Sequence, residues 1–88
     1  MTSTVTVPAA MMRSEIASQR KDWPLVVQLL RFVLSREPGN ANALYRLSLA
    51  HALSGDVAQA RATAAQLARV APDYPGLSEW VRNLALAP

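Results

Sequence analysis

Apolar residues recur along most of the chain with the spacing of amphipathic helices. Leu44, Leu47 and His51 follow one another at intervals of three and four residues, which places them on one helical face. Residues 57–71 carry a complementary stripe of alanine and leucine. We find no alternation of apolar and polar residues of the kind that marks a half-buried strand. The pattern therefore predicts an all-α protein.

The residues that interrupt the pattern divide it into about five helices. Asp22, Asn40, Asp56 and Asp73 stand where a side chain can accept backbone N–H bonds at a helix start. Proline then closes two of the apolar stretches, because it cannot continue a helix. The predicted helices cover residues 9–20, 23–37, 41–54, 57–71 and 75–86.

These breaks are periodic along the chain. Pro38 and Pro72 are 34 residues apart, and so are Asp22 and Asp56. A repeating unit of this length, made of two helices and closed by proline, is typical of an α-solenoid in which successive helical hairpins stack.

The side chains of the unit at residues 41–74 also match a known repeat pattern. A Gly-Asp turn at Gly55 and the closing Pro72 stand where the tetratricopeptide repeat (TPR) family has them, and the chain resembles that family. Two departures are Ala64, in a place the family gives to an aromatic residue, and Arg13, in a place it gives to leucine. The matching helix positions in residues 41–74 are Leu44, Leu47, Ser48, His51 and Ala60.

The resemblance implies one domain of antiparallel helix–turn–helix repeats, preceded by a flexible or extended arm. The arm would cover residues 1–8 and the domain residues 9–88. Within the domain, the expected parts are a repeat at 9–40, a repeat at 41–74 and a capping helix at 75–86.

In TPR arrays the first helix of each pair lines a concave face, and the resemblance implies a partner-binding groove there. Tyr45 and Leu49 would take central places, which favours an apolar or amphipathic helix as the ligand. The alternative is that the last helix, with Trp80 and Leu84, fills part of this groove itself. The predicted groove residues are Met11, Glu15, Asn42, Tyr45, Leu49, Leu53, Glu79 and Asn83.

A second candidate surface lies on the predicted helix that begins near Trp23. Its apolar side chains cover a wider arc than the stripe of an ordinary surface helix. Leu25, Leu29 and Phe32 form a stripe beyond the positions that the repeat core needs. Either the amino-terminal arm and first helix cover this apolar stripe, or another chain does.

Composition and charge exclude more than they assign. The net charge is +3, but the arginines are spread singly along the chain, whereas phosphate binding is usually indicated by a cluster on one face. The chain has no cysteine and one histidine, His51, so we expect no metal, no cofactor and no catalysis, with His51 packed in the core. The missing cysteines, and an amino terminus unlike a signal peptide, favour a cytoplasmic setting without a membrane span.

These observations lead to one hypothesis and two alternatives. The chain is expected to be a small non-enzymatic adaptor or chaperone that binds an apolar or helical segment of a partner protein. The first alternative is a self-association scaffold that forms homo-oligomers. The second is a helix-turn-helix nucleic-acid binder, whose affinity would fall steeply with salt.

Overall fold

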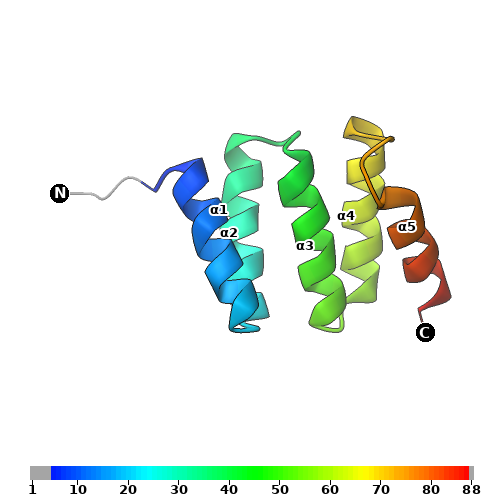
Figure 1. Cartoon of the computed structure of the whole chain (residues 1–88), viewed down its shortest axis with the longest axis horizontal. Coiled ribbons are helices and arrows are strands. Elements are labelled where there is room, and N and C mark those ends of the chain that lie inside the picture. Colours follow the sequence, from blue (N-terminus) through cyan, green and yellow to red (C-terminus); the bar gives the residue numbers. More distant parts are fainter. Residues whose placement is uncertain (1–4, 88) are drawn as a thin grey trace.

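The structure, a computed structural model, describes residues 5–87 as five helices that stand side by side in an elongated row of 48 × 26 × 18 Å. No strand occurs among these residues, so the predicted all-α fold is confirmed. Consecutive helices run in opposite directions and form two hairpins followed by a single helix (Figure 1). The helices are α1 (Val7–Gln19), α2 (Trp23–Arg36), α3 (Ala41–Leu53), α4 (Val57–Val70) and α5 (Leu77–Leu86).

The turn inside each hairpin is built in the same way. Lys21, between α1 and α2, has φ of 59°, and Gly55, between α3 and α4, has φ of 90°. In each turn the next residue, Asp22 or Asp56, donates its N–H to the carbonyl five positions earlier, at 2.9 Å and 2.8 Å. Each aspartate also accepts a backbone N–H with its side chain, so it caps the following helix as predicted.

Two helices begin elsewhere than the sequence pattern indicated. Thr6 caps α1, since its hydroxyl accepts the N–H of Ala9 at 3.2 Å, so residues 7 and 8 lie in the helix and not in the expected arm. Half of that arm, residues 1–4, lies outside the described residues. The predictions that α5 begins at residue 75 and that Asp73 caps it are wrong, because Gly76 precedes the helix with φ of 82° and no side-chain cap.

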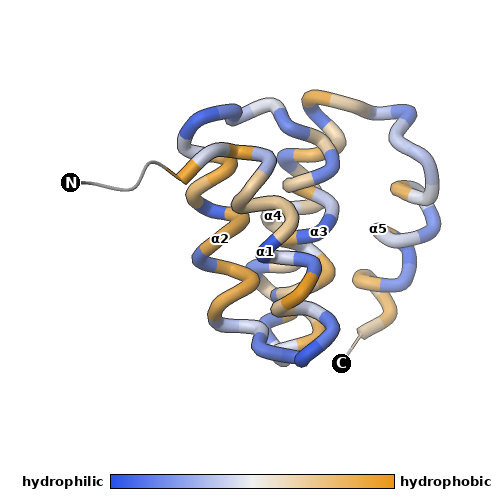
Figure 2. Tube along the Cα trace, turned by 60° about the vertical axis from the view of Figure 1, so that its left-hand side comes forward, coloured by the Kyte–Doolittle hydropathy of each residue, from blue (hydrophilic) through white to orange (hydrophobic). Residues whose placement is uncertain are grey.

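The core lies between the helices of each hairpin and continues from one hairpin to the next. In α2 the buried positions carry Val26, Leu30 and Val33, whereas the corresponding stripe of α4 carries Ala60, Ala64 and the larger Leu67. Figure 2 shows hydrophobic residues along much of α2, while the turn between α1 and α2 is hydrophilic. The helices thus pack as the amphipathic pattern predicts.

The last helix is held on the second hairpin by apolar packing and by hydrogen bonds. Leu77 of α5 is buried against Leu44 of α3 and Leu67 of α4. Arg61 of α4 donates to the Leu84 carbonyl at 3.0 and 2.7 Å and to the Ala87 carbonyl at 3.2 Å. Because the last carbonyls of a helix have no partner within it, this guanidinium caps the carboxyl end of α5.

Within residues 5–87, no helix has both the length and the apolar character that crossing a membrane requires.

Candidate functional site

The widest hollow at the amino-terminal end of the molecule lies between α1 and α3. It has a volume of about 430 Å³. Met12, on the α1 side of this hollow, is 64% exposed. The lining residues are Pro8, Met11, Met12, Glu15, Asn42 and Arg46.

A second hollow continues along α3 toward the α1–α2 turn. Arg46 lines both hollows, which adjoin along α3, and we call the two together the α1–α3 groove. At its far end Leu53 is 61% exposed beside the half-buried Leu49 and Trp23. The second hollow is lined by Ser18, Trp23, Arg46, Leu49, Ala50 and Leu53.

Five of the eight predicted groove residues line this groove, and three do not. Tyr45 packs against Tyr74, with ring centroids 5.2 Å apart, and meets Trp80 edge-on at 6.5 Å. The remaining two, Glu79 and Asn83, are exposed on α5 and line neither hollow. The groove is therefore confined to the α1–α3 side of the molecule, and α5 covers the part around Tyr45. The five that line it are Met11, Glu15, Asn42, Leu49 and Leu53.

Hydrogen bonds fix the side chains where α5 covers α3. The Trp80 indole N–H donates to the Ser48 hydroxyl at 2.8 Å, and Ser48 donates to the Ala60 carbonyl at 2.7 Å. The Tyr74 hydroxyl donates to Asn42 Oδ1 at 2.7 Å. Asn42 consequently belongs both to the groove and to the contact that closes the neighbouring junction.

The predicted apolar stripe is partly covered by its own chain. Leu29 and Phe32 are half-buried and pack against the core shared by α1, α2 and α3. Leu25 remains 41% exposed beside Ile16 of α1, which is 44% exposed. The Arg36 guanidinium lies 5.2 Å from the centre of the Phe32 ring, an arrangement that is weakly attractive.

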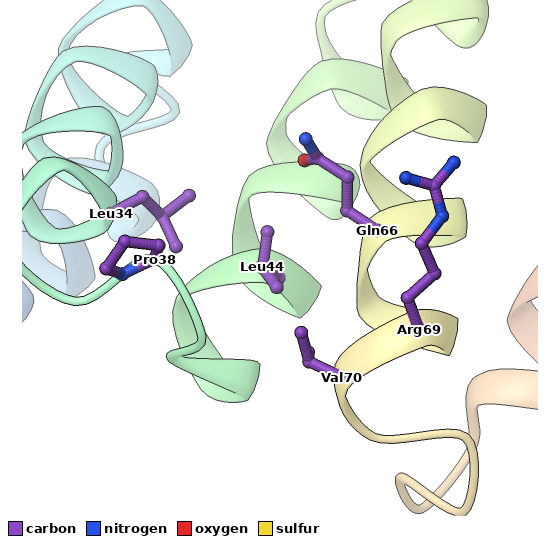
Figure 3. A pocket seen from close by; sticks show the side chains of 6 residues that line it. All are labelled: Leu34, Pro38, Leu44, Gln66, Arg69 and Val70. Carbon is purple, nitrogen blue, oxygen red and sulfur yellow. The ribbon is translucent and has the colours of Figure 1, made fainter.

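A further hollow that the sequence did not indicate separates α2 from α4. Leu34 and Pro38 lie on one side, Leu44 of α3 forms the floor, and Val70 of α4 lies opposite (Figure 3). Gln66 and Arg69 complete its α4 side. Arg69 and the Gln66 amide make this rim more polar than the Leu49–Leu53 end of the α1–α3 groove.

Sequence reasoning missed Met12, Trp23 and Arg46 of the groove. Asn42, Arg46 and Leu49 are four and three residues apart, a spacing that places them on one helical face. Arg46 could therefore have been predicted from its two groove neighbours. Trp23 lies in the first turn of α2, a second helix of a repeat, whereas the groove was predicted on the first helices. Its position along α2 therefore gave no indication that it lines the groove.

His51 is buried on α3, as expected for a packing residue. Burial lowers the pKa of its imidazole below the ordinary 6.5; Asp56 acts in the opposite direction and Arg31 in the same direction as burial. Among residues 5–87, no three acidic, histidine or cysteine residues lie close enough together to hold a metal ion.

Stacked helical hairpins with a groove along their first helices define the class of helical-repeat interaction proteins. The family model described as Tetratricopeptide repeat matches residues 17–79. This match covers more than half of the chain, and the chain belongs to the tetratricopeptide repeat family. That family supplies protein–protein interaction modules, and this is the general role of the chain. No curated protein matches the sequence closely enough to count as a relative.

Proposed function

We propose that this protein is an adaptor or chaperone that holds an apolar or helical segment of a partner protein in the α1–α3 groove. The observation that carries the proposal is the exposure of Met12 and Leu53 at the two ends of one groove. Removing such side chains from water on binding is favourable. A cytoplasmic setting is part of the proposal, since the chain has no cysteine for disulfides.

The lining suggests how a segment would be recognised. Leu49, Leu53 and Trp23 offer an apolar surface for large side chains at one end. Met11 and Met12 at the other end are flexible and polarisable, and can adapt to different side chains. Between them, Arg46 offers hydrogen-bond donors to a carboxylate or a backbone carbonyl of the bound segment.

The experiment compares capture of partners by two matched variants. Leu53→Glu places a charge in the groove, and Val70→Glu places one at a similarly exposed site outside it, since the two residues are 61% and 51% exposed. A chain captured from the native host by the parent protein is then purified and titrated against each variant. We expect Leu53→Glu to weaken binding at least about tenfold and Val70→Glu to leave it unchanged. Equal affinities for both variants would refute the groove.

Self-association is a second candidate function, favoured by a different observation. Ile16 and Leu25 are exposed side by side at the α1–α2 end of the molecule. Sedimentation of the purified chain at tens of micromolar tests this directly. An oligomer that Leu25→Asp or Phe32→Asp converts to a monomer would support it, and a monomeric parent protein would exclude it.

A further inference from the structure

An almost entirely apolar hollow lies between α4 and α5, away from the residues of the α1–α3 groove. We call it the α4–α5 trough; its volume is about 320 Å³. Val81, on its α5 side, is 43% exposed. Small side chains make up most of the surface, which lets another backbone approach closely. The lining residues are Arg61, Ala64, Ala65, Ala68, Val81, Leu84 and Ala85.

The internal repeat shows what kind of element such a trough accepts. Moving back 34 positions from the trough leads to a surface of α2 and α3 beside which α4 stands, packed closely on α3 and separated from the end of α2 by the hollow at Leu34 and Val70. There Leu34 of α2 packs against a cluster that contains Leu44 of α3 and Leu67 of α4, and Figure 3 shows Leu34 and Leu44 on neighbouring elements. By this correspondence, the trough has the position and shape of a seat for one more helix, antiparallel to α5.

Most side chains that line the trough are smaller than their counterparts on the surface beside α4, and the exceptions are Arg61 and Leu84. Leu34, Leu47 and His51 correspond to the smaller Ala68, Val81 and Ala85, whereas Ala50 corresponds to the larger Leu84. A helix like α4, whose buried stripe is mostly alanine, would leave unfilled space in this wider seat, and unfilled space costs packing energy. The trough therefore fits a helix that brings large apolar side chains.

The charges around the trough favour a helix with acidic flanks. Arg61 is the one charged residue that lines the trough. Arg82 directly follows Val81 and is exposed. Glu79 precedes Val81 by two positions, which turns its side chain to another face of α5. A second copy of this chain, with its net charge of +3, would bring further positive charge to this surface.

We propose that the α4–α5 trough is a second docking site, which takes an amphipathic helix of a partner protein with large apolar residues on one face and acidic residues along its flanks. The apolar face would cover Val81 and the alanines, and a flanking carboxylate would lie near Arg61. This site stands independently of the α1–α3 groove, because the two share no lining residue.

The probe is a synthetic amphipathic peptide of about 18 residues with leucine at i, i+3, i+4, i+7 and i+11 and glutamate on both flanks. One control peptide carries lysine in place of each glutamate, and another carries alanine in place of each leucine. Binding to the full chain is followed by fluorescence anisotropy, and backbone amide NMR shifts locate the peptide. We expect the largest shifts at Ala65, Ala68 and Ala85, and at least about tenfold weaker binding of each control peptide.

Two variants of matched residue type separate docking from folding. Val81→Glu should weaken binding of the acidic peptide at least about tenfold, whereas Val70→Glu, on a different side of α4, should leave it unchanged; far-UV circular dichroism checks that both variants fold. The proposal is overturned by equal effects of the two variants, by equal affinity for the lysine peptide, or by shifts centred on Leu49 and Leu53. Self-association of the chain through Ala65 and Ala68 without peptide would also overturn it, by making a second copy the occupant.

Discussion

The two junctions between successive first helices, α1–α3 and α3–α5, occupy corresponding places in the repeat but are filled differently. At the α3–α5 junction, three aromatic side chains, Tyr45, Tyr74 and Trp80, pack together. The residues 34 positions earlier are Met11, Asn40 and Arg46. Met11 and Arg46 line the open groove, so the exchange of these side chains separates a closed junction from an open one.

A buried serine shows the same difference. Ser48 accepts the Trp80 indole N–H and bridges it to α4 through the Ala60 carbonyl. Ser14 occupies the corresponding position in α1 and is also fully buried, but its hydroxyl donates to the Met11 carbonyl of its own helix at 2.6 Å. One repeat pattern therefore supports either a closed structural contact or an open groove, depending on a few large side chains.

The hairpins themselves divide the core volume in opposite ways. In the first hairpin the small buried residues lie on α1 and the large ones on α2, whereas in the second the larger residues lie mainly on α3 and Leu67 is the one large buried residue of α4. Each hairpin thus pairs a bulky helix with a slender one, which keeps the interior filled. The buried residues on α1 are Ala10, Ser14 and Ala17; those on α3 include Leu44, Leu47 and His51.

The closed junction should be most sensitive at its buried apolar anchor. Leu77→Ala removes a side chain that is buried against Leu44 and Leu67, and we expect the free energy of unfolding to fall by about 2–4 kcal/mol. Urea denaturation followed by circular dichroism measures the loss. Leu53→Ala, at an exposed site of the open groove, should change stability by less than about 0.5 kcal/mol. Similar losses for the two variants would mean that α5 contributes little to the fold.

The aromatic contact of Trp80 should contribute less to the free energy of unfolding than the buried Leu77 does. Trp80→Ala removes the half-buried ring and its bond to Ser48, and the expected loss is about 2–3 kcal/mol. Trp80→Phe keeps an aromatic ring and should lose only about 1 kcal/mol. Hydrogen exchange at the amides of α5 shows whether the helix detaches. If the alanine variant protects those amides as well as the parent protein does, the junction is held by Leu77 and Arg61 alone.

Converting the open junction toward the closed one tests the comparison in the opposite direction. The double variant Met11→Tyr with Arg46→Trp introduces the aromatic residues found 34 positions later. We expect partner binding in the α1–α3 groove to weaken at least about tenfold, because the new rings occupy the groove, while stability changes by about 1 kcal/mol or less. Titration of a captured partner gives the first quantity and urea denaturation the second. Unchanged affinity in a folded variant would show that the partner binds elsewhere.

The fold was predictable because its signals are local. Asp22, Asn40 and Asp56 each accept an N–H three residues ahead, so the sequence near each turn is sufficient to place the helix start. The start of α5 was placed two residues early because its first turn depends on the left-handed backbone of Gly76 rather than on a capping side chain.

The site was predictable only in part because its boundaries depend on contacts between distant residues. Tyr45 has the position of a groove residue, but Tyr74 and Trp80, which come much later in the chain, cover it. Arg46 was not among the predicted groove residues, although its side chain is half-buried and lines both hollows. Helical spacing assigns a face to each residue and leaves open which neighbouring helix covers that face.

The smallest expected effect is a pH dependence of stability that arises from His51. Ala17, His51 and Ala85 correspond to one another, and only His51 can titrate. Because burial lowers the pKa of His51 in the folded chain, the unfolded chain binds a proton more readily, so the free energy of unfolding falls as the pH drops below about 6.5. Above that range the imidazole is neutral in both states and contributes no pH dependence. His51→Gln should remove this component, so the stability of the variant relative to the parent protein should rise as the pH is lowered from 7.5 to 5.5 in urea titrations. A constant difference across this range would mean that His51 is as easily protonated in the folded chain as in water.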